Sequence, residues 1–457
     1  MNKFHYALTV VLILIASALQ AAEIKVNSFA ELATYTSQSG NVISMKPGVY
    51  QLNDYWTADS MRVRHDRKQF QFLNFKGDSN VFQLDGVTIE VDNALRLALN
   101  APIHTSLFKV TGNHNTIQGL QIRYVGEGTS RGGAALEIAG TGTVLKKLTL
   151  HVTGSSPYGY GDLLGKGDRS LTKLRKHSGL LITGSDTKLY DCKVYMRSLG
   201  HAFFIQGGID SYLENCYAEG EMRSTNDMLK ETSGPAFEEG FASIYEGYDG
   251  KKSIKPDYMK SLNECGFRTY GAGGSPRRET GKVTLVNCTA KNMRVGFALA
   301  ANEETAPVTL RDCKAIACER GYYLSKAVSE NCSGDMLYGP LLYLVGNERS
   351  QIDMILEPGE SRYKVHALAT ICGTGHEVSI QTNKKTKKIT APIMLGYGMP
   401  DSGENASPIP EAYAGDVTLT NKTSAPVIVG AEAKNCTVVT QGKVERNKGS
   451  NIEIVGK

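Results

Sequence analysis

One pattern of apolar residues recurs along the chain and constrains its fold more than any other feature. An apolar residue is followed by a second three positions on and a third five positions on. Two copies lie 24 residues apart, as Leu189, Cys192 and Val194 and then as Leu213, Cys216 and Ala218. Units that recur at such a period, each too small to bury its own apolar face, are typical of solenoids. Residues 191–220 are therefore predicted to form one full coil of an all-β, right-handed parallel β-helix.

The same pattern occurs on both sides of this coil. The other copies are Leu84/Val87/Ile89, Ile117/Leu120/Ile122, Leu145/Leu148/Leu150, Leu285/Cys288/Ala290, Leu310/Cys313/Ala315 and Ala433/Cys436/Val438. A weaker copy begins at Leu419, with Lys422 in its middle position. The stack of coils is thus expected to extend through most of the chain.

Each coil also contains a second short strand, at 134–139, 179–183, 202–206, 297–300 and 322–325. Because side chains alternate along a strand, one row should point into the helix and one row outward. The predicted inward row is Leu136, Leu180, Phe203, Phe297 and Tyr322. The predicted outward row is Glu137, Leu181, Phe204, Ala298 and Tyr323.

The cysteines fit the repeat better than they fit a disulfide framework. Six of the nine follow Asn or Asp, namely Cys192, Cys216, Cys288, Cys313, Cys332 and Cys436. All but Cys332 clearly occupy the middle apolar position, which favours buried free thiols packed as small hydrophobic side chains. Disulfides remain the alternative for an exported protein. The mild net charge of +5 does not indicate nucleic-acid binding, although a local basic strip could bind an anionic polymer.

The N-terminus has the features of a secretory signal. Residues 1–22 contain the basic Lys3, an apolar run over 8–19 and small residues at Ala21-Ala22. The apolar run is too short for a comfortable membrane span. A periplasmic or secreted protein is therefore expected, with no membrane partner, as a monomer.

Residues 23–457 are predicted to form a single domain with regular coils over about 80–330. A short helix over 29–38, with Ser28 and Glu31 as a capping box, should cover the N-terminal end of the stack. Two segments, 151–177 and 221–281, interrupt the repeat. Long loops on a repeat scaffold are typically functional or mobile. Residues 331–457 are expected to form irregular coils.

The stacked coils with Asn-Cys turns, the N-terminal helix and the Lys-Pro-Gly-Val-Tyr sequence at 46–50 resemble the pectate-lyase-like superfamily of parallel β-helix proteins. The resemblance covers most of 24–330 and implies a polysaccharide lyase or glycoside hydrolase. Gly200-His201-Ala202 matches only part of the Gly-His-Gly signature of polygalacturonases, and their paired Asp is absent. The Arg-x-Pro-x-x-Arg segment of pectate lyases is also absent. Glu219 and Glu221 resemble the calcium-ligand pair of alginate and dermatan lyases with this fold.

A cation or a histidine precedes the same strand in coil after coil. These residues are Arg131, Lys176 with His177, Arg197 with His201, Arg294 and Arg320. Equal positions in successive coils stack about 4.8 Å apart. The pattern predicts a basic strip along one groove, and arginine is suited to bidentate binding of carboxylate or sulfate. The alternative is a solvated edge that protects strand ends from aggregation.

His177 and His201 fall at nearly equivalent positions of neighbouring coils. Each is a candidate general base with a pKa near neutrality, or else a structural histidine bonded to a turn carbonyl. Tyr158 and Tyr160, in a glycine-spaced loop, could stack on sugar rings or deliver a proton. The alternative for that loop is simple surface packing.

For a lyase that cleaves a uronic-acid polymer by β-elimination, we expect Arg197 and Arg223 to neutralise the substrate carboxylate. His201 would take the proton, with His177 or Lys176 as substitute, and Tyr160 would protonate the leaving oxygen. The predicted substrate-binding residues are Arg131, Tyr158, Lys166, Phe204, Arg268, Tyr270, Arg294, Arg320 and Tyr323.

Three alternatives stay open at this point. No cofactor is certain, but calcium bound by Asp162, Glu221 and Asp227 could neutralise the carboxylate instead. A glycoside hydrolase would need two carboxylates, for which the same three residues form the pool. A non-catalytic carbohydrate-binding protein is the third alternative, because solenoids also serve as scaffolds.

Overall fold

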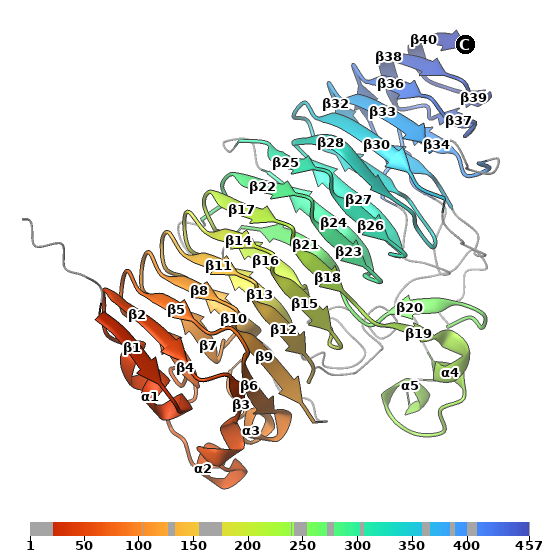
Figure 1. The fold of residues 1–457 in the computed structure, drawn as a ribbon. Helices are drawn as coiled ribbons and strands as arrows, with labels where there is room; N and C mark the ends of the chain where they lie inside the picture. The colour runs from red at the N-terminus through yellow and green to blue at the C-terminus, as the bar shows by residue number, and fades with distance from the viewer. Residues whose placement is uncertain are drawn as a thin grey trace, which may run out of the picture.

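The protein folds as one long stack of β-coils (Figure 1). The computed structural model describes residues 22–102, 104–126, 133–154, 176–238, 240–241, 254–271, 278–301, 306–358, 366–383, 389–399 and 409–456. Strands of successive coils pair in parallel and form a 25-stranded and a 13-stranded sheet around a shared apolar core. Connections between parallel strands are right-handed in nearly all proteins. The predicted right-handed parallel β-helix is confirmed.

The larger sheet takes two strands from most coils. Its members are β1 (Ala22–Val26), β2 (Asn41–Met45), β3 (Gly48–Gln51), β5 (Val81–Gln83), β6 (Val87–Asp92), β8 (Thr116–Gln118), β9 (Gln121–Val125), β11 (Val144–Lys146), β12 (Thr149–Val152), β14 (Lys188–Tyr190), β15 (Lys193–Met196), β17 (Ser211–Glu214), β18 (Tyr217–Glu219), β22 (Val283–Val286), β23 (Thr289–Lys291), β25 (Val308–Arg311), β26 (Lys314–Ile316), β28 (Ala327–Gly334), β30 (Gln351–Leu356), β32 (Gly373–Thr374), β33 (Glu377–Thr382), β35 (Ala414–Gly415), β36 (Thr418–Asn421), β38 (Ala433–Thr440) and β40 (Ser450–Gly456).

The smaller sheet takes one strand from each coil. Its members are β4 (Leu73–Phe75), β7 (Phe108–Val110), β10 (Ala134–Ile138), β13 (Ser178–Ile182), β16 (Phe203–Gln206), β21 (Cys265–Tyr270), β24 (Val295–Ala300), β27 (Arg320–Ser325), β29 (Leu342–Val345), β31 (Ala369–Ile371), β34 (Ile393–Leu395), β37 (Val427–Val429) and β39 (Val444–Asn447).

The apolar repeat forms the interior of the larger sheet. Leu189 pairs with Leu145 on one side and Leu213 on the other, so the first positions of the repeat stack as predicted. One copy needs correction, because Phe82, and not Leu84, pairs with Ile117. Two extra residues lengthen the turn of that coil, which explains why simple spacing chose the wrong first position.

A residue in the left-handed conformation makes the tight turn between the two larger-sheet strands in many of the coils. Asp191, Asn215 and Asn287 have φ angles of 56°, 54° and 50°. Asn and Asp tolerate this conformation better than most residues, which explains why they precede the middle-position cysteines. Their side chains also pair along the stack, with Asn287 donating to Asn215 at 2.8 Å and Asn215 to Asp191 at 3.2 Å.

All nine cysteines are free and buried, as the repeat predicted. The middle-position thiols lie close to main-chain carbonyl oxygens. Cys288, for example, donates to the carbonyls of Leu213 and Val286, each at 3.5 Å. These thiols therefore fill the interior and satisfy their weak donor at the same time.

The interior of the smaller sheet contains a stack of aromatic rings. Neighbouring ring centroids along Phe203, Phe267, Phe297 and Tyr322 lie 4.8 to 4.9 Å apart, with ring planes within 5° of parallel. The predicted inward row is confirmed, since Leu136, Leu180, Phe203, Phe297 and Tyr322 are all buried. Phe267 is an addition from the segment expected to be a long excursion, because β21 inserts between β16 and β24.

A folded arm leaves the stack between β18 and β21 (Figure 1). It contains the antiparallel pair β19 (Met222–Ser224) and β20 (Met259–Ser261) and the short helices α4 (Thr225–Leu229) and α5 (Pro235–Glu238). The hydroxyl of Tyr338 accepts from the backbone N–H of Met259 at 3.0 Å, and Glu319 accepts from that of Ser261 at 2.7 Å. The chain thus returns to the stack on fixed anchors.

Short helices cover the N-terminal part of the stack, namely α1 (Phe29–Tyr35), a 3₁₀ turn (Leu52–Asp54), α2 (Ala58–Arg62) and α3 (Asn93–Leu99). The hydroxyl of Ser28 accepts from the N–H of Glu31 at 3.2 Å, while the Glu31 carboxylate accepts from Asn27 at 2.8 Å. The predicted cap is therefore present, but the Glu31 carboxylate accepts from the N–H of Asn27 and not from that of the capping residue Ser28. The helix ends at Tyr35 and not at the predicted residue 38. Within the described ranges, no helix has the length and apolarity to cross a membrane.

The coils beyond residue 330 are more regular than the sequence indicated. β30 pairs with β33 over six residues, and parallel pairing continues to β40. Leu419 pairs with Val438 and is therefore the third position of its repeat copy, not the first. The buried Val417 takes the middle position that Lys422 was expected to hold. The apolar repeat thus continues through Ala414, Val417 and Leu419, although the sequence analysis assigned Leu419 to the wrong position of the repeat.

Candidate active site

A cavity of about 610 Å³ lies on the outer face of the smaller sheet, over β10, β13, β16 and β21. Its lining combines polar groups with apolar and aromatic side chains. The lining residues are His104, Ser106, Gly133, Ala134, Lys176, Ser178, Leu181, Thr183, His201, Phe204, Gln206, Glu264 and Tyr270. The predicted outward residues Leu181 and Phe204 pair across β13 and β16 and form part of its floor.

The carboxylate of Glu264 lies buried at this cavity, with 3% of the residue exposed. Its Oε1 lies 2.6 Å from Nζ of Lys176 and 3.2 Å from Nη2 of Arg294. Its Oε2 lies 3.5 Å from Nε2 of His201. Burial opposes ionisation, but the surrounding His201, Lys176 and Arg294 outweigh it and hold the pKa of Glu264 well below its usual range. Glu264 is therefore ionised at neutral pH.

His201 is neutral at neutral pH. Burial lowers the pKa of His201 to about 3. The Glu264 carboxylate opposes this shift, and the nearby cations, Lys176 most strongly, add to it. Since His201 is uncharged, Lys176 and Arg294 supply the positive charge that Glu264 needs. Nδ1 of His201 is buried and has no hydrogen-bond partner among the described residues. An unsatisfied buried nitrogen is costly, and a bound ligand would relieve that cost.

Arg268 and Tyr270 extend from β21 next to His201. The Arg268 guanidinium lies 4.0 Å from the centroid of the Tyr270 ring, and that ring lies 5.8 Å from the His201 ring. Nε of Arg268 is buried, again with no partner in the described part of the chain. Burial raises the pKa of Tyr270, although Arg268 opposes the shift, so the phenol keeps its proton near neutral pH. A cation, a neutral base and a phenol are thus brought together.

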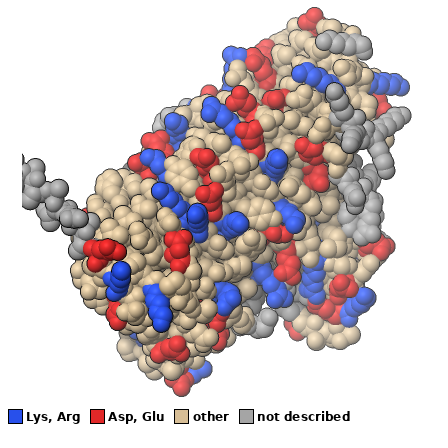
Figure 2. All heavy atoms as spheres, in the orientation of Figure 1, with Lys and Arg blue, Asp and Glu red and all other residues tan. Residues whose placement is uncertain are grey.

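The predicted basic strip is interrupted in the described part of the chain by the carboxylate of Glu264. Lys176 and Arg294 both turn to Glu264 and form an ion cluster in which Glu264 and Arg294 are buried and Lys176 is partly exposed. Arg320 is buried as well, and Arg197 lies outside the cavity, 3.3 Å from Glu221. Figure 2 shows basic and acidic side chains interspersed over the face it presents.

Of the three residues expected to hold calcium, Glu221 and Asp227 lie in the described part of the chain, and each pairs with a cation. Glu221 pairs with Arg197 at the base of the arm, and Asp227 pairs with Lys230 on α4 at 3.1 Å. Arg223, the second expected neutraliser, forms an ion pair within the arm and does not line the cavity. Among the residues that the structure describes, no group of three or more His, Cys, Asp or Glu is placed to hold a metal ion.

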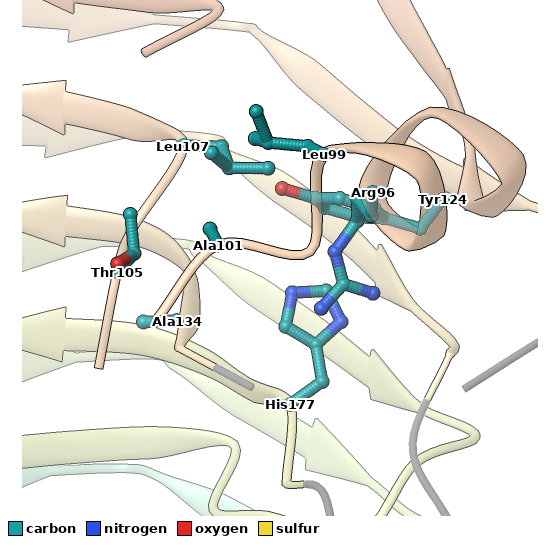
Figure 3. Close-up of a pocket in the computed structure, with 8 residues that line it drawn as sticks. All are labelled: Arg96, Leu99, Ala101, Thr105, Leu107, Tyr124, Ala134 and His177. Carbon is teal, nitrogen blue, oxygen red and sulfur yellow. The ribbon is translucent and has the colours of Figure 1, made fainter. Parts of the chain in front are cut away.

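His177 has the structural role and not the catalytic one. Its Nδ1 lies 2.7 Å from the carbonyl oxygen of Thr153, and its ring packs edge-on against Tyr124 at 4.7 Å. Burial lowers its pKa well below the usual value. It lines a separate, smaller cavity (Figure 3), so the two histidines are not equivalent.

The remaining predicted binding residues divide into those near the cavity and those that cannot be placed. Phe204 and Tyr270 line it, and Tyr323 lies further along the sheet, 4.8 Å from Tyr343 by ring centroid and 5.9 Å from Arg268. Outside the described residues lie Arg131, Tyr158, Tyr160, Asp162 and Lys166.

Glu264 is the residue that the sequence analysis missed, because it lies in the segment expected to be a loop. One signal could have found it. Gly266-Phe267 repeats the Gly-apolar pair that also begins neighbouring strands as Gly296-Phe297. Glycine is needed there, since a Cβ at Gly266 would lie 2.6 Å from the Cβ of Ala290. Aligning these pairs places β21 in the sheet and Glu264 just before it.

No protein-family model matches the chain, and no curated protein matches it. Several solved structures share a similar course of the chain. The tailspike protein of E. coli bacteriophage HK620, in complex with a pentasaccharide, has a TM-score of 0.48 at 8% identity, over 93% of this chain and 73% of its own. A mannuronic-acid-specific family 6 polysaccharide lyase from human gut microbiota has a TM-score of 0.45 at 9% sequence identity, and the match covers 95% of this chain and 82% of the lyase. An endo-xylogalacturonan hydrolase from Aspergillus tubingensis has a TM-score of 0.36 at 7% sequence identity, and the match covers 95% of this chain and 93% of the hydrolase. Similarities this low do not identify a reaction.

Proposed function

We propose that the protein is a polysaccharide lyase that cleaves a uronic-acid-containing polymer by β-elimination in the cavity over β10, β13, β16 and β21. The observation that carries the proposal is the neutral His201, whose Nδ1 is unpartnered among the described residues, beside Arg268 and Tyr270. β-Elimination needs a cation for the substrate carboxylate, a base for the C5 proton and an acid for the leaving oxygen. These three side chains can supply the three functions.

The division of roles follows from their chemistry. Arg268 is not itself a lining residue, but its guanidinium lies 4.0 Å from the centroid of the ring of Tyr270, which lines the cavity. From there it neutralises the carboxylate, which makes the C5 proton more acidic. His201 takes that proton, the bond from C4 to the leaving oxygen breaks, and a double bond forms between C4 and C5. Tyr270 gives its proton to the leaving oxygen. The proposal thus moves the neutralising role from Arg197 and Arg223 to Arg268.

Glu264 is a positioning residue in this scheme. Its ionised carboxylate faces Nε2 of His201 at 3.5 Å, while Lys176 and Arg294 fix it from the other side. When His201 accepts a proton, the adjacent negative charge stabilises the imidazolium. The low pKa of His201 is therefore compatible with a role as base, because the charge of an anionic substrate also raises this pKa.

A glycoside hydrolase is the second candidate, and the charges of the cavity disfavour it. Hydrolysis needs two carboxyl groups, one of them protonated to act as the acid. Glu264 is the only carboxylate among the described residues that line the cavity. Its pKa lies well below the usual range, so it does not carry a proton at neutral pH.

The test is a panel of acidic polysaccharides incubated with the purified protein, with and without EDTA. We expect ultraviolet-absorbing unsaturated products on at least one polymer. His201→Ala and Tyr270→Phe should each lower the rate at least about 100-fold, the scale of a lost general base or acid. His151→Ala is the matched control, because His151 stacks on Tyr195 on another face and should leave the rate unchanged.

Other products would change the proposal. New reducing ends without the chromophore would identify a hydrolase, and binding without turnover would identify a carbohydrate-binding protein. Near-normal activity of His201→Ala would remove that residue from the role of base. Export as a periplasmic or secreted protein belongs to the same proposal and rests on residues 1–22 alone. A mature protein that retains these residues in the cytoplasm would contradict it.

A further inference from the structure

A second, smaller cavity adjoins the proposed active site (Figure 3). Ala134 lines both cavities, and His177 of the small cavity follows Lys176 of the large one. Arg96 on α3, Tyr124 on β9 and Thr105 supply its other polar groups. The remaining lining is apolar, and the space has room for about one particle the size of a water molecule.

Arg96 brings a buried positive charge to this cavity. Only 4% of the residue is exposed. Its guanidinium donates to neutral oxygens alone, at 2.9 Å to Oδ1 of Asn93 and at 3.4 Å to the carbonyls of Thr153 and Gly154. No carboxylate pairs with Arg96 among the described residues. A buried charge without a counter-charge is costly, so this site calls for an anion.

The other polar groups of the cavity do not supply that negative charge. The hydroxyl of Tyr124 donates to the carbonyl of Ala135 at 3.0 Å, and burial raises its pKa, so it stays a neutral phenol. His177 is held by Thr153 and is neutral as well, because burial lowers its pKa. The guanidinium lies 5.4 Å from the centroid of the Tyr124 ring, a cation–π contact that offsets only part of the missing charge.

We propose that the cavity is a binding site for one small monovalent anion, a halide opposite the guanidinium of Arg96, with the hydroxyl of Thr105 as a further donor. The size of the space limits the ligand to a single-atom ion such as chloride and excludes a sugar acid. A single negative charge balances Arg96, whereas a divalent anion would leave a buried excess of negative charge. The small cavity is therefore an ion site distinct from the polymer site.

Thermal unfolding of the full-length protein in different sodium salts at matched ionic strength tests this site. Chloride and bromide should raise Tm by about 1–3 °C in a saturable manner relative to gluconate, which is too large to enter. Formate has three heavy atoms and is a second size control, so a shift in formate as large as that in chloride would contradict a site for a single-atom ion. Matched ionic strength separates binding from general screening.

Two variants and one diffraction experiment complete the test. Arg96→Met should abolish the anion-dependent shift, and Thr105→Val should weaken it. Arg62→Met, a change at an exposed arginine of α2, should retain it. Crystals soaked in bromide should show an anomalous peak beside Arg96, which remains decisive if Arg96→Met fails to fold. An equal shift in gluconate, a retained shift in Arg96→Met, or no bromide peak would overturn the proposal.

Discussion

The turns of the larger sheet and the ion cluster of the smaller sheet are built in opposite ways. Several turns place Asn or Asp in the same left-handed conformation, as Asn215 and Asn287 do, and the side chains of these two residues bond to each other along the stack. The cluster at Glu264 occurs once. It joins Lys176 and Glu264, which lie 88 positions apart in the sequence.

This difference separates the residues that maintain the fold from those that give it a site. A repeated position contributes a small and nearly additive amount to stability, because each coil contacts only its neighbours. The cluster instead places several charges out of water, where each depends on the others. Substitutions should therefore have small, local effects in the turns and large, coupled effects at the cluster.

Glu264→Gln should produce the largest effect. It leaves Lys176 and Arg294 facing a neutral amide in a buried site, and removal of one partner of a buried ion pair costs about 3–5 kcal/mol. We expect a corresponding fall in the free energy of unfolding, measured by denaturant titration, together with loss of lyase activity.

The matched control for Glu264→Gln is Glu330→Gln. Glu330 pairs with Arg311 on an exposed surface, with 69% of its side chain exposed, and its replacement should change stability by no more than about 0.5 kcal/mol. Equal effects of the two substitutions would contradict the contrast between repeat surface and cluster.

The same contrast explains what could be predicted from the sequence. The repeat predicted the fold, the buried cysteines and the inward aromatic row, because stacking turns a local period into long-range contacts. It also placed His201 and Phe204 at one strand, whereas Tyr270 was expected in the long loop over 221–281 that returns near them. Glu264 was not predicted, since its role depends on where the arm returns to the stack. The ion pairs that Lys176 and Arg294 form with Glu264 were not predicted either, because residue spacing does not show whether a cation is paired.

An intermediate effect should appear in the pH dependence of stability. The native pKa of His201 is about 3, whereas an unfolded histidine titrates near 6.5. Between those values the unfolded chain binds a proton that the native site does not bind. The unfolding free energy should therefore fall as the pH drops from about 6.5 towards 3, by up to about 1.4 kcal/mol per pH unit.

His201→Gln removes this titration and should flatten the acid side of the curve. Denaturant titrations at several pH values give the slope of the unfolding free energy against pH for the parent protein and for His201→Gln. Part of the slope should remain, because His177 is also held neutral by burial. A slope identical to that of the parent protein would mean that native His201 takes up its proton normally and is not desolvated by the cluster.

The smallest effect should be a gain at an irregular turn. Lys147 takes the left-handed position, with φ of 54°, that Asp191 occupies in the next coil. A lysine is strained there, and asparagine tolerates the conformation better. Lys147→Asn should therefore raise the unfolding free energy by about 0.5–1 kcal/mol, measured by denaturant titration. Lys146→Asn, one residue earlier at the exposed end of β11, should bring no gain. If both variants behaved alike, the left-handed turn would not explain why Asn and Asp recur in this repeat.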